Sequence, residues 1–319
     1  MRKVKRVEVE KDAPGQKRRA GRGRRRRIAI LSRKKCLYAT RRLAEEIRRA
    51  GHSPVIMDPL ACAILVAEEG PGLLFRGRRA ALPDLVIPRI GASVTEAGLT
   101  VLTQLELLGC PSLNRPDGIR QSRDKLMCLQ ILSAAGFPVP ATSLVQPGMS
   151  PESLLRAAGG LPVVVKLLRG TQGVGVMLAR TQEELKTLLS TFGELGHPVL
   201  LQRFIGEAAG CDLRLFVVGD KVAGAMRRRA RGGDFRSNIH RGGDASPVSA
   251  GEDCEALAVK AARTLGLEAA GVDLIVSRRG PMVIEVNSSP GFEGLEGATG
   301  QNIAAAVVER GLEMIGARL

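Results

Sequence analysis

The sequence has few of the residues on which many kinds of site depend. Its 319 residues include no Trp, one Tyr and three His, and His52, His197 and His240 lie far apart. This spacing gives no support to a zinc site. The six Cys are scattered with no CxxC pair, which is typical of reduced thiols in a cytosol. No apolar run approaches about 18 residues and nothing resembles a signal peptide, so we expect a cytoplasmic protein that does not associate with membranes.

Positive charge is abundant but unevenly distributed. The net charge of the chain is +16, and residues 1–27 hold 13 Lys or Arg against three acids. A segment of this composition has almost nothing to bury, so we predict a basic, disordered tail. One hypothesis is an electrostatic arm that contacts RNA or another polyanion without sequence specificity. An inert solvated extension and an upstream start codon are the alternatives.

After the tail, strand and helix patterns alternate. A buried-strand pattern over residues 27–31 is followed by helical spacing over residues 41–50. Residues 54–57 and 85–90 are predicted to form further strands. This alternation predicts an α/β domain with a parallel sheet, which we place at residues 28–122.

The remainder of the chain, residues 123–319, has a different character because hairpins dominate it. Strands at residues 212–218 and 221–227 are predicted to pair across a Gly-Asp turn. Helices that would cover the sheets are predicted at residues 125–135, 183–192 and 252–265.

A second predicted hairpin, GVDLIVSRRGPMVIEVN, carries two acids and an amide. If a three-residue turn pairs Ser277 with Pro281, the register follows by counting outward. Asp273 then lies directly opposite Glu285, and Asn287, two residues further on, points to the same face. Facing carboxylates repel unless a cation lies between them, and three oxygen ligands suit Mg²⁺. The alternative is an exposed hairpin with two solvated acids.

A glycine-rich loop upstream offers a place for phosphates. In the segment PVVVKLLRGTQGVGVMLA, Gly170, Gly173 and Gly175 let backbone N–H groups approach an anion closely. Lys166 lies in the strand before the loop, where its ammonium group can reach a phosphate. The loop is neither a Walker loop, since no Lys-Ser or Lys-Thr follows the glycines, nor a dinucleotide fingerprint, since it leads into a strand. Taken alone, it is equally compatible with an ordinary hairpin turn.

Residues 226–247 form a segment between the hairpins that is rich in Arg and Gly. A segment that binds nucleic acid would be expected to contain several aromatic residues that stack on the bases, and only Phe235 is present. Guanidinium groups suit phosphates and carboxylates equally well. The segment is therefore predicted to clamp anionic substrates, and the alternative is a solvated basic loop.

Further segments are distinctive: ILSR, MDPL, VIPRIG and RDKL in the first half, and QRFI, CDLR, DFRSNIHRGG, GVD and IEVNSSPG in the second. With the glycine loop they resemble the ATP-grasp ligases, and within them the RimK group of ATP-dependent glutamate ligases. The resemblance runs from Arg27 almost to the C terminus and leaves out the basic tail. It implies an α/β pre-ATP-grasp domain followed by an α+β ATP-grasp fold, whose two subdomains close on ATP.

The resemblance also implies roles for individual residues. Those expected to bind ATP are Lys125, Lys166, Gly170, Gly173, Gly175, Gln202, Arg203, Phe204, Ile205, Asp212, Arg236, Ser237 and Asn238. Within this set, Lys166 and Arg236 would act in catalysis on the transferred phosphate. Residues 202–205 would line the adenine pocket, and Asp212 would accept hydrogen bonds from the ribose. Mg²⁺ or Mn²⁺, as two ions, would be held by Asp273, Glu285 and Asn287.

Three positions depart from the pattern of the family. The adenine segment usually has Glu where this chain has Arg203, and the position of Arg227 is often acidic. Ser288 stands where Ala is common. Both arginines add positive charge around the site, which bears on the choice of acceptor.

The reaction implied by the resemblance joins L-glutamate to an acceptor carboxylate through an acyl phosphate. The expected acceptor is the acidic C-terminal tail of a small-subunit ribosomal protein, and the expected assembly is a homotetramer. One alternative is the same chemistry on a pterin or deazaflavin cofactor or on an amino-group carrier protein. Another is a non-catalytic ribosome- or RNA-binding protein with a degenerate ATP site. The intact Lys166, Asp273, Glu285 and Asn287 argue against that second alternative.

Overall fold

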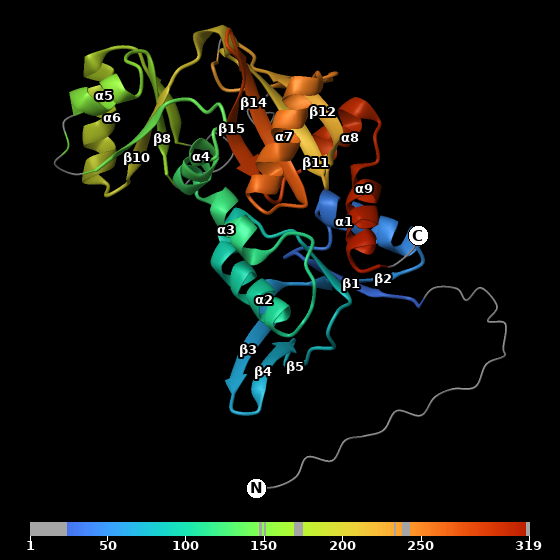
Figure 1. The fold of residues 1–319 in the computed structure, drawn as a ribbon. Helices are drawn as coiled ribbons and strands as arrows, with labels where there is room; N and C mark the ends of the chain where they lie inside the picture. Colours follow the sequence, from blue (N-terminus) through green and yellow to red (C-terminus); the bar gives the residue numbers. More distant parts are fainter. Residues whose placement is uncertain are drawn as a thin grey trace, which may run out of the picture.

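The computed structural model describes residues 24–146, 149, 151–168, 175–232, 234–237 and 243–316 (Figure 1). Gly170, Gly173, Asn238 and residues 1–23 of the basic tail lie outside these ranges. The expectations of a disordered tail and of RNA contact therefore stay predictions. Within the described ranges, no helix is both long enough and apolar enough to cross a membrane.

The N-terminal part is built on a small parallel sheet. Its strands, in the order β2-β1-β6, are β2 (Ser53–Met57), β1 (Arg27–Leu31) and β6 (Leu85–Pro88). Ile28 and Ile30 of β1 pack toward helix α1 (Tyr38–Arg49), whereas the alternating residues Ala29 and Leu31 pack toward helix α2 (Thr95–Leu107). Both faces of β1 are thus covered, which explains its continuous apolar sequence. The predicted strands and helix are confirmed, and the helix begins at Tyr38 instead of Arg41.

A second sheet in this part is not foreseen by the sequence reasoning. Strands β3 (Cys62–Ala67), β4 (Gly70–Phe75) and β5 (Arg78–Arg79) form an antiparallel sheet that projects from the body of the molecule (Figure 1). Its inner side packs on α2, as part of the core that contains Leu73. Short 3-10 helices lie at η1 (Pro59–Ala61), η2 (Ala92–Val94) and η3 (Gly206–Ala208).

Two helices lead from the N-terminal sheet to the rest of the chain. They are α3 (Pro116–Arg123) and α4 (Lys125–Ala134). A carboxylate oxygen of Asp124 accepts hydrogen bonds from the backbone N–H groups of Leu126 and Met127, both at 2.9 Å, and so caps the N terminus of α4. The helix predicted at residues 125–135 is confirmed.

Gly118 lets helix α3 pack directly on the loop that follows helix α7 (Glu252–Thr264). A Cβ atom at this position would lie 2.6 Å from the Leu265 carbonyl oxygen and 2.8 Å from that of Gly266. We expect Gly118→Ala to lower the free energy of unfolding by about 1–3 kcal/mol, because backbone atoms must move to admit the methyl group. Urea unfolding measures the change.

The control is Gly297→Ala in helix α8 (Glu293–Thr299). Apart from the chain neighbours and the nearby backbone of the helix itself, no described atom lies within 4 Å of a Cβ added there. Alanine in an open helical position should be neutral or stabilise by up to about 1 kcal/mol. Equal effects of the two substitutions would contradict the proposed contact at Gly118.

A four-stranded antiparallel sheet forms one half of the second part. Its order is β7-β10-β8-β9, with β7 (Thr142–Val145), β10 (Val199–Arg203), β8 (Val163–Leu167) and β9 (Val176–Ala179). Helices α5 (Pro151–Ala157) and α6 (Gln182–Glu194) cover one face (Figure 1). Val163 and Val165 point into the core under these helices, so Val164 and Lys166 point to the opposite face.

A five-stranded antiparallel sheet forms the other half. Its order is β13-β12-β11-β14-β15, with β13 (Asp244–Pro247), β12 (Lys221–Arg229), β11 (Cys211–Val218), β14 (Ala269–Ser277) and β15 (Gly280–Asn287). Helix α7 covers one face of this sheet. The sheet and helix predictions for this region are confirmed, including the hairpin of residues 271–287.

The turn of that hairpin corrects one prediction. Ser277 pairs with Gly280, not with Pro281, so the turn has two residues instead of three. A β-bulge next to Asp273 then shifts the register by one residue, and Asp273 faces Glu285 as predicted. The tighter turn and the bulge compensate each other.

The C-terminal helix returns to the N-terminal sheet. Helix α9 (Ile303–Met314) packs on α1 and β6, and one hydrophobic core contains residues of both ends of the chain. Its members include Ile30 and Ile87 on one side and Val308 and Leu312 on the other. The two parts of the chain therefore share a core.

Candidate active site

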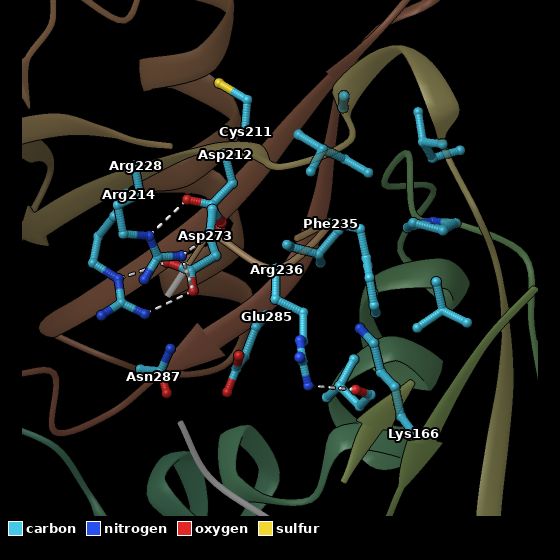
Figure 2. A pocket seen from close by; sticks show the side chains of 18 of the residues that line it. Lys166, Cys211, Asp212, Arg214, Arg228, Phe235, Arg236, Asp273, Glu285 and Asn287 are labelled. Atoms are coloured by element: carbon cyan, nitrogen blue, oxygen red, sulfur yellow. Dashed lines mark hydrogen bonds and ion pairs between the residues drawn. The ribbon is translucent and has the colours of Figure 1, made fainter. Parts of the chain in front are cut away.

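The two antiparallel sheets of the second part face each other across a cavity of about 610 Å³. Apart from Gly175, every predicted site residue that the structure describes lines it. These residues are Lys125, Lys166, Gln202, Arg203, Phe204, Ile205, Asp212, Arg236, Ser237, Asp273, Glu285 and Asn287. Figure 2 shows Lys166 across the cavity from the acidic and arginine side chains of the five-stranded sheet.

Gly175 has a local role in the structure. It lies before β9 with φ of +72°, and its carbonyl oxygen accepts a hydrogen bond from the Leu167 N–H at 2.8 Å. The left-handed conformation favours glycine, and a Cβ atom would lie 2.5 Å from the Leu167 side chain. Phosphate contact by the other two loop glycines falls outside the described residues.

Two lysines supply positive charge on the side of the four-stranded sheet. Lys125, at the start of α4, donates from Nζ to the Leu167 carbonyl oxygen at 3.1 Å. Burial lowers the pKa of Lys166 to about 8, an effect that the nearby charge of Glu285 partly offsets. Burial also lowers the pKa of Lys125. An anion bound between the two ammonium groups would stabilise their charged forms.

Phe204 and Ile205, in the segment of residues 202–205, give the cavity an apolar part together with Phe235. Gln202 is buried and donates from Nε2 to Thr142 Oγ1 at 2.9 Å. The rings of Phe204 and Phe235 meet edge to face with centroids 6.3 Å apart. The backbone N–H of Arg203 donates to the Ala141 carbonyl oxygen at 2.8 Å, so this N–H is not free to contact a ligand.

Asp273, on β14, and Glu285 and Asn287, on the edge strand β15, lie together in the wall of the cavity, as the hairpin register requires. Figure 2 shows the side chains of Glu285 and Asn287 extending toward the same side of the cavity. Enclosure by protein atoms and the charge of Asp273 raise the pKa of Glu285, although its side chain is open to the cavity. Asn287 Nδ2 is a buried donor without a partner in the described structure.

Two arginines, which the sequence analysis did not single out, surround the acids: Arg228 is buried and Arg214 is half-buried. Arg214 donates to both oxygens of Asp273 at 2.7 Å, and Arg228 donates to both oxygens of Asp212 at 2.6 Å (Figure 2). Arg228 also lies 2.9 Å from Asp273. Burial alone would raise the pKa of Asp273, but the two guanidinium groups hold it below its usual range. The four side chains form one buried charge cluster.

The cluster bears on the expected role of Asp212. One of its oxygens also accepts a short hydrogen bond from Ser237 Oγ. Asp212 is thus already engaged by Arg228 and Ser237, and a ribose hydroxyl would have to share or displace these donors.

Arg236 is held in place at the edge of the cavity. Its guanidinium group pairs with Asp234 at 2.9 Å and donates to the Val176 carbonyl oxygen of β9 at 3.1 Å. It also lies 5.5 Å from the centroid of the Phe235 ring. These contacts join the arginine-rich segment to the four-stranded sheet.

The fold, with a cavity between two antiparallel sheets, is that of an ATP-grasp protein, and comparison with protein families agrees. Residues 27–119 match the RimK PreATP-grasp domain, and residues 122–310 match the RimK-like ATP-grasp domain. The chain belongs to the RimK-like ATP-grasp family.

Relatives in several bacteria cover almost the same length. A protein of Halorhodospira halophila named "Probable alpha-L-glutamate ligase" is 46% identical over 283 residues, which are 89% of this chain and 94% of the relative. A protein of the same name in Cellvibrio japonicus is 48% identical over 282 residues, which are 88% of this chain and 94% of the relative.

Solved structures share the fold. The RimK domain protein ATP-grasp from Sphaerobacter thermophilus is 25% identical, with a TM-score of 0.67 over 90% of this chain and 99% of that one. The ATP-grasp ligase PsnB, complexed with its minimal precursor, Mg and ADP, is 21% identical, with a TM-score of 0.68 over 89% of this chain and 96% of that one. At this identity, PsnB is informative about the fold alone.

Proposed function

We propose that the protein is an ATP-dependent ligase that joins L-glutamate to an acceptor carboxylate, most fittingly an acidic C-terminal protein tail such as that of a small-subunit ribosomal protein. The observation that carries the proposal is the cavity, in which two lysines face a pair of opposed acids. Cations opposite oxygen ligands suit a nucleotide whose phosphates are bridged by a metal ion. The names of the bacterial relatives support glutamate as the amine substrate.

In this proposal ATP lies lengthwise in the cavity. The adenine occupies the apolar part at residues 202–205, and the phosphates lie between Lys125, Lys166 and Arg236. The relatively low pKa of Lys166, about 8, still leaves its ammonium group charged at neutral pH. Charge on the phosphates is thereby neutralised where the phosphoryl group is transferred.

The residues at the hairpin fit a magnesium ion. Asp273 and Glu285 are opposed carboxylates, and the described residues provide no group of three His, Cys, Asp or Glu that would hold a metal by themselves. Both oxygens of Asp273 already accept from arginine, so Glu285 and Asn287 would be the principal protein ligands. Such a sparse protein shell suits Mg²⁺, or Mn²⁺, shared with phosphate oxygens and water, with two ions expected. When bound, the metal would stabilise charge on the phosphates.

The chemistry follows in two displacements. The acceptor carboxylate attacks the γ-phosphorus of ATP, the bond to ADP breaks, and an acyl phosphate forms. The glutamate amine then attacks the acyl carbon, loses a proton and expels phosphate, which leaves an amide. Lys166 and Arg236 bind the transferred group in both steps, and the two sheets that enclose the cavity limit access of water.

The test is incorporation of glutamate into an acidic peptide. Purified protein, MgATP, L-glutamate and a peptide that ends in glutamates should release ADP and phosphate, and the peptide should gain whole glutamate residues in mass. Parallel reactions with a pterin, a deazaflavin cofactor and an amino-group carrier protein determine the acceptor class. ATP hydrolysis without incorporation into any of them would leave the fold as described and overturn the ligase function.

A pH dependence follows from the pKa of Lys166. Below about pH 8 the lysine of the free protein is already charged, so ADP binding needs no proton. Above that pH the free lysine is neutral and must take up a proton, so the affinity for MgADP should fall by up to about tenfold per pH unit. Titration calorimetry from pH 6.5 to 9.5 measures the decline. In Lys166→Arg, the guanidinium remains charged and the part of the decline that begins near pH 8 should disappear; an unchanged decline would assign it to another group.

A further inference from the structure

Arg89 stands where the two parts of the chain meet. It follows the carboxyl end of β6, and its Nη2 donates to the Pro290 carbonyl oxygen at 2.7 Å. Its guanidinium carbon lies 5.6 Å from the centroid of the Phe292 ring. In open parallel sheets, ligands bind in the crevice outside the carboxyl ends of the strands. Pro290 lines the cavity, so here that crevice adjoins the candidate active site.

No acid in the described structure forms an ion pair with Arg89, and the charged neighbour that acts on it is another cation, Arg123. Burial and the neighbouring Arg123 lower its pKa to about 10, which leaves it charged at neutral pH. Arg123 uses its own donors on the carbonyl oxygens of Gly91 and Ile90 and on Thr95 Oγ1. A partly buried cation beside a second cation is costly unless an anion joins them.

The segment that Arg89 contacts carries unused polar groups. In the described structure, four buried side-chain polar atoms lack a hydrogen-bond partner, and three of them belong to consecutive residues at the end of β15. They are Asn287 Nδ2, Ser288 Oγ and Ser289 Oγ. Asn287 and Ser289 line the cavity. Buried donors without partners are rare in folded proteins and call for a ligand.

We propose that Arg89, Asn287 and Ser289 form a binding site for a substrate carboxylate. The hydrogen bond to Pro290 holds the guanidinium beside this segment, and a planar guanidinium can bind both oxygens of a carboxylate. The ATP phosphates have their own cations on the other side of the cavity, at Lys125 and Lys166. The inference rests on the proposed function, in which both the incoming glutamate and the acidic acceptor carry carboxylates.

The experiment compares Arg89→Met with the wild type. We expect the KM of one carboxylate substrate to rise roughly 10–100-fold, the usual effect of losing a hydrogen-bonded charge, while the KM of ATP stays within about twofold. A rise for L-glutamate assigns the site to the incoming amino acid, and a rise for the acidic peptide assigns it to the acceptor. Arg89→Lys keeps the positive charge but loses the planar pair of N–H donors. Its KM for that substrate should lie between those of the wild type and Arg89→Met.

If L-glutamate is the ligand, its analogues show which of its two carboxylates binds at the Arg89 site. The wild type should discriminate against either glutamine, which lacks the side-chain carboxylate, or isoglutamine, which lacks the α-carboxylate. Arg89→Met should lose that discrimination. Ser289→Ala provides a second, milder variant in case Arg89→Met does not fold. Arg120→Met, which removes an exposed arginine paired with Asp117, is the control for an Arg-to-Met change outside the proposed site and should leave the KM values unchanged.

Two results would overturn the inference. In the first, the wild type incorporates glutamate, but Arg89→Met and Ser289→Ala leave both carboxylate KM values unchanged. In the second, all KM values and kcat shift together with a lower melting temperature, as expected if Arg89 only holds the loop in place. Calorimetry with L-glutamate or the peptide, in the presence of MgADP, tests the site without turnover. If the wild type binds neither, the inference fails regardless of what the ligase assay shows.

Discussion

Replacing Glu285 with Gln should lower the rate of ATP turnover by about 10²–10³-fold, the scale for losing one preorganised charge-stabilising group. The substitution removes a carboxylate that faces Asp273 and would hold a metal ion against the phosphates. Stability should change little, because no described side chain forms an ion pair with Glu285 and its side chain is open to the cavity. The measurements are ATP turnover, the Mg²⁺ dependence of ADP binding, and the unfolding midpoint.

Glu309→Gln is the control for this prediction. Glu309 lies on the exposed side of α9 and is not among the residues that line the cavity, so its replacement should leave turnover and Mg²⁺ dependence unchanged. Turnover near the wild-type rate in Glu285→Gln, or undiminished turnover without added divalent metal, would refute the assignment of Glu285 as a metal ligand.

Arg228→Met should destabilise the fold more than any other single change considered, by about 3–5 kcal/mol. Arg228 is 3% exposed and holds Asp212 at 2.6 Å and Asp273 at 2.9 Å. Without it, Asp212 becomes a buried carboxylate whose remaining partner is a serine hydroxyl. Urea unfolding at pH 7 measures the loss.

Two neighbouring arginines serve as controls. Arg227 precedes Arg228 in β12 but lies on the exposed side, so Arg227→Met should change stability by no more than about 0.5 kcal/mol. Arg214→Met should have an intermediate effect, because Asp273 keeps Arg228 as a partner. If Arg227→Met and Arg228→Met have equal effects, the buried cluster does not contribute as described.

The sequence alone does not predict that Arg228 is buried and Arg227 exposed. Counting back from the Gly-Asp turn, a regular hairpin would place Asp212 opposite Arg227. A bulge between Phe216 and Val217 shifts the register, so that Asp212 faces Arg228 instead. A one-residue shift exchanges the two faces of a strand, and nothing in the local pattern of three arginines indicates which one is buried.

The hairpin of residues 271–287 brings Asp273 opposite Glu285 as predicted, but for a partly different reason. The turn is shorter than expected, and the bulge next to Asp273 restores the predicted facing of the acids. Periodicity identified the strands at residues 27–31 and 54–57 and helices α1, α4, α6 and α7, but it did not identify helices α2 and α9. It also did not identify the β3–β5 sheet, in which β3 is mostly exposed and β5 has two residues, or the unpaired polar atoms at Ser288 and Ser289, which depend on packing between distant segments.

The return of α9 to the N-terminal sheet has a consequence for synthesis on the ribosome. Ile28 and Ile30 are translated long before Ile303, Val308 and Leu312, yet all five belong to one core. Domains usually fold in the order of translation, N-terminal first. Here the nascent chain must keep part of one face of the sheet β2-β1-β6 uncovered, and open to aggregation or to chaperones, until α9 has been synthesised. Strand β1 completes its packing only when helix α9 has left the exit tunnel.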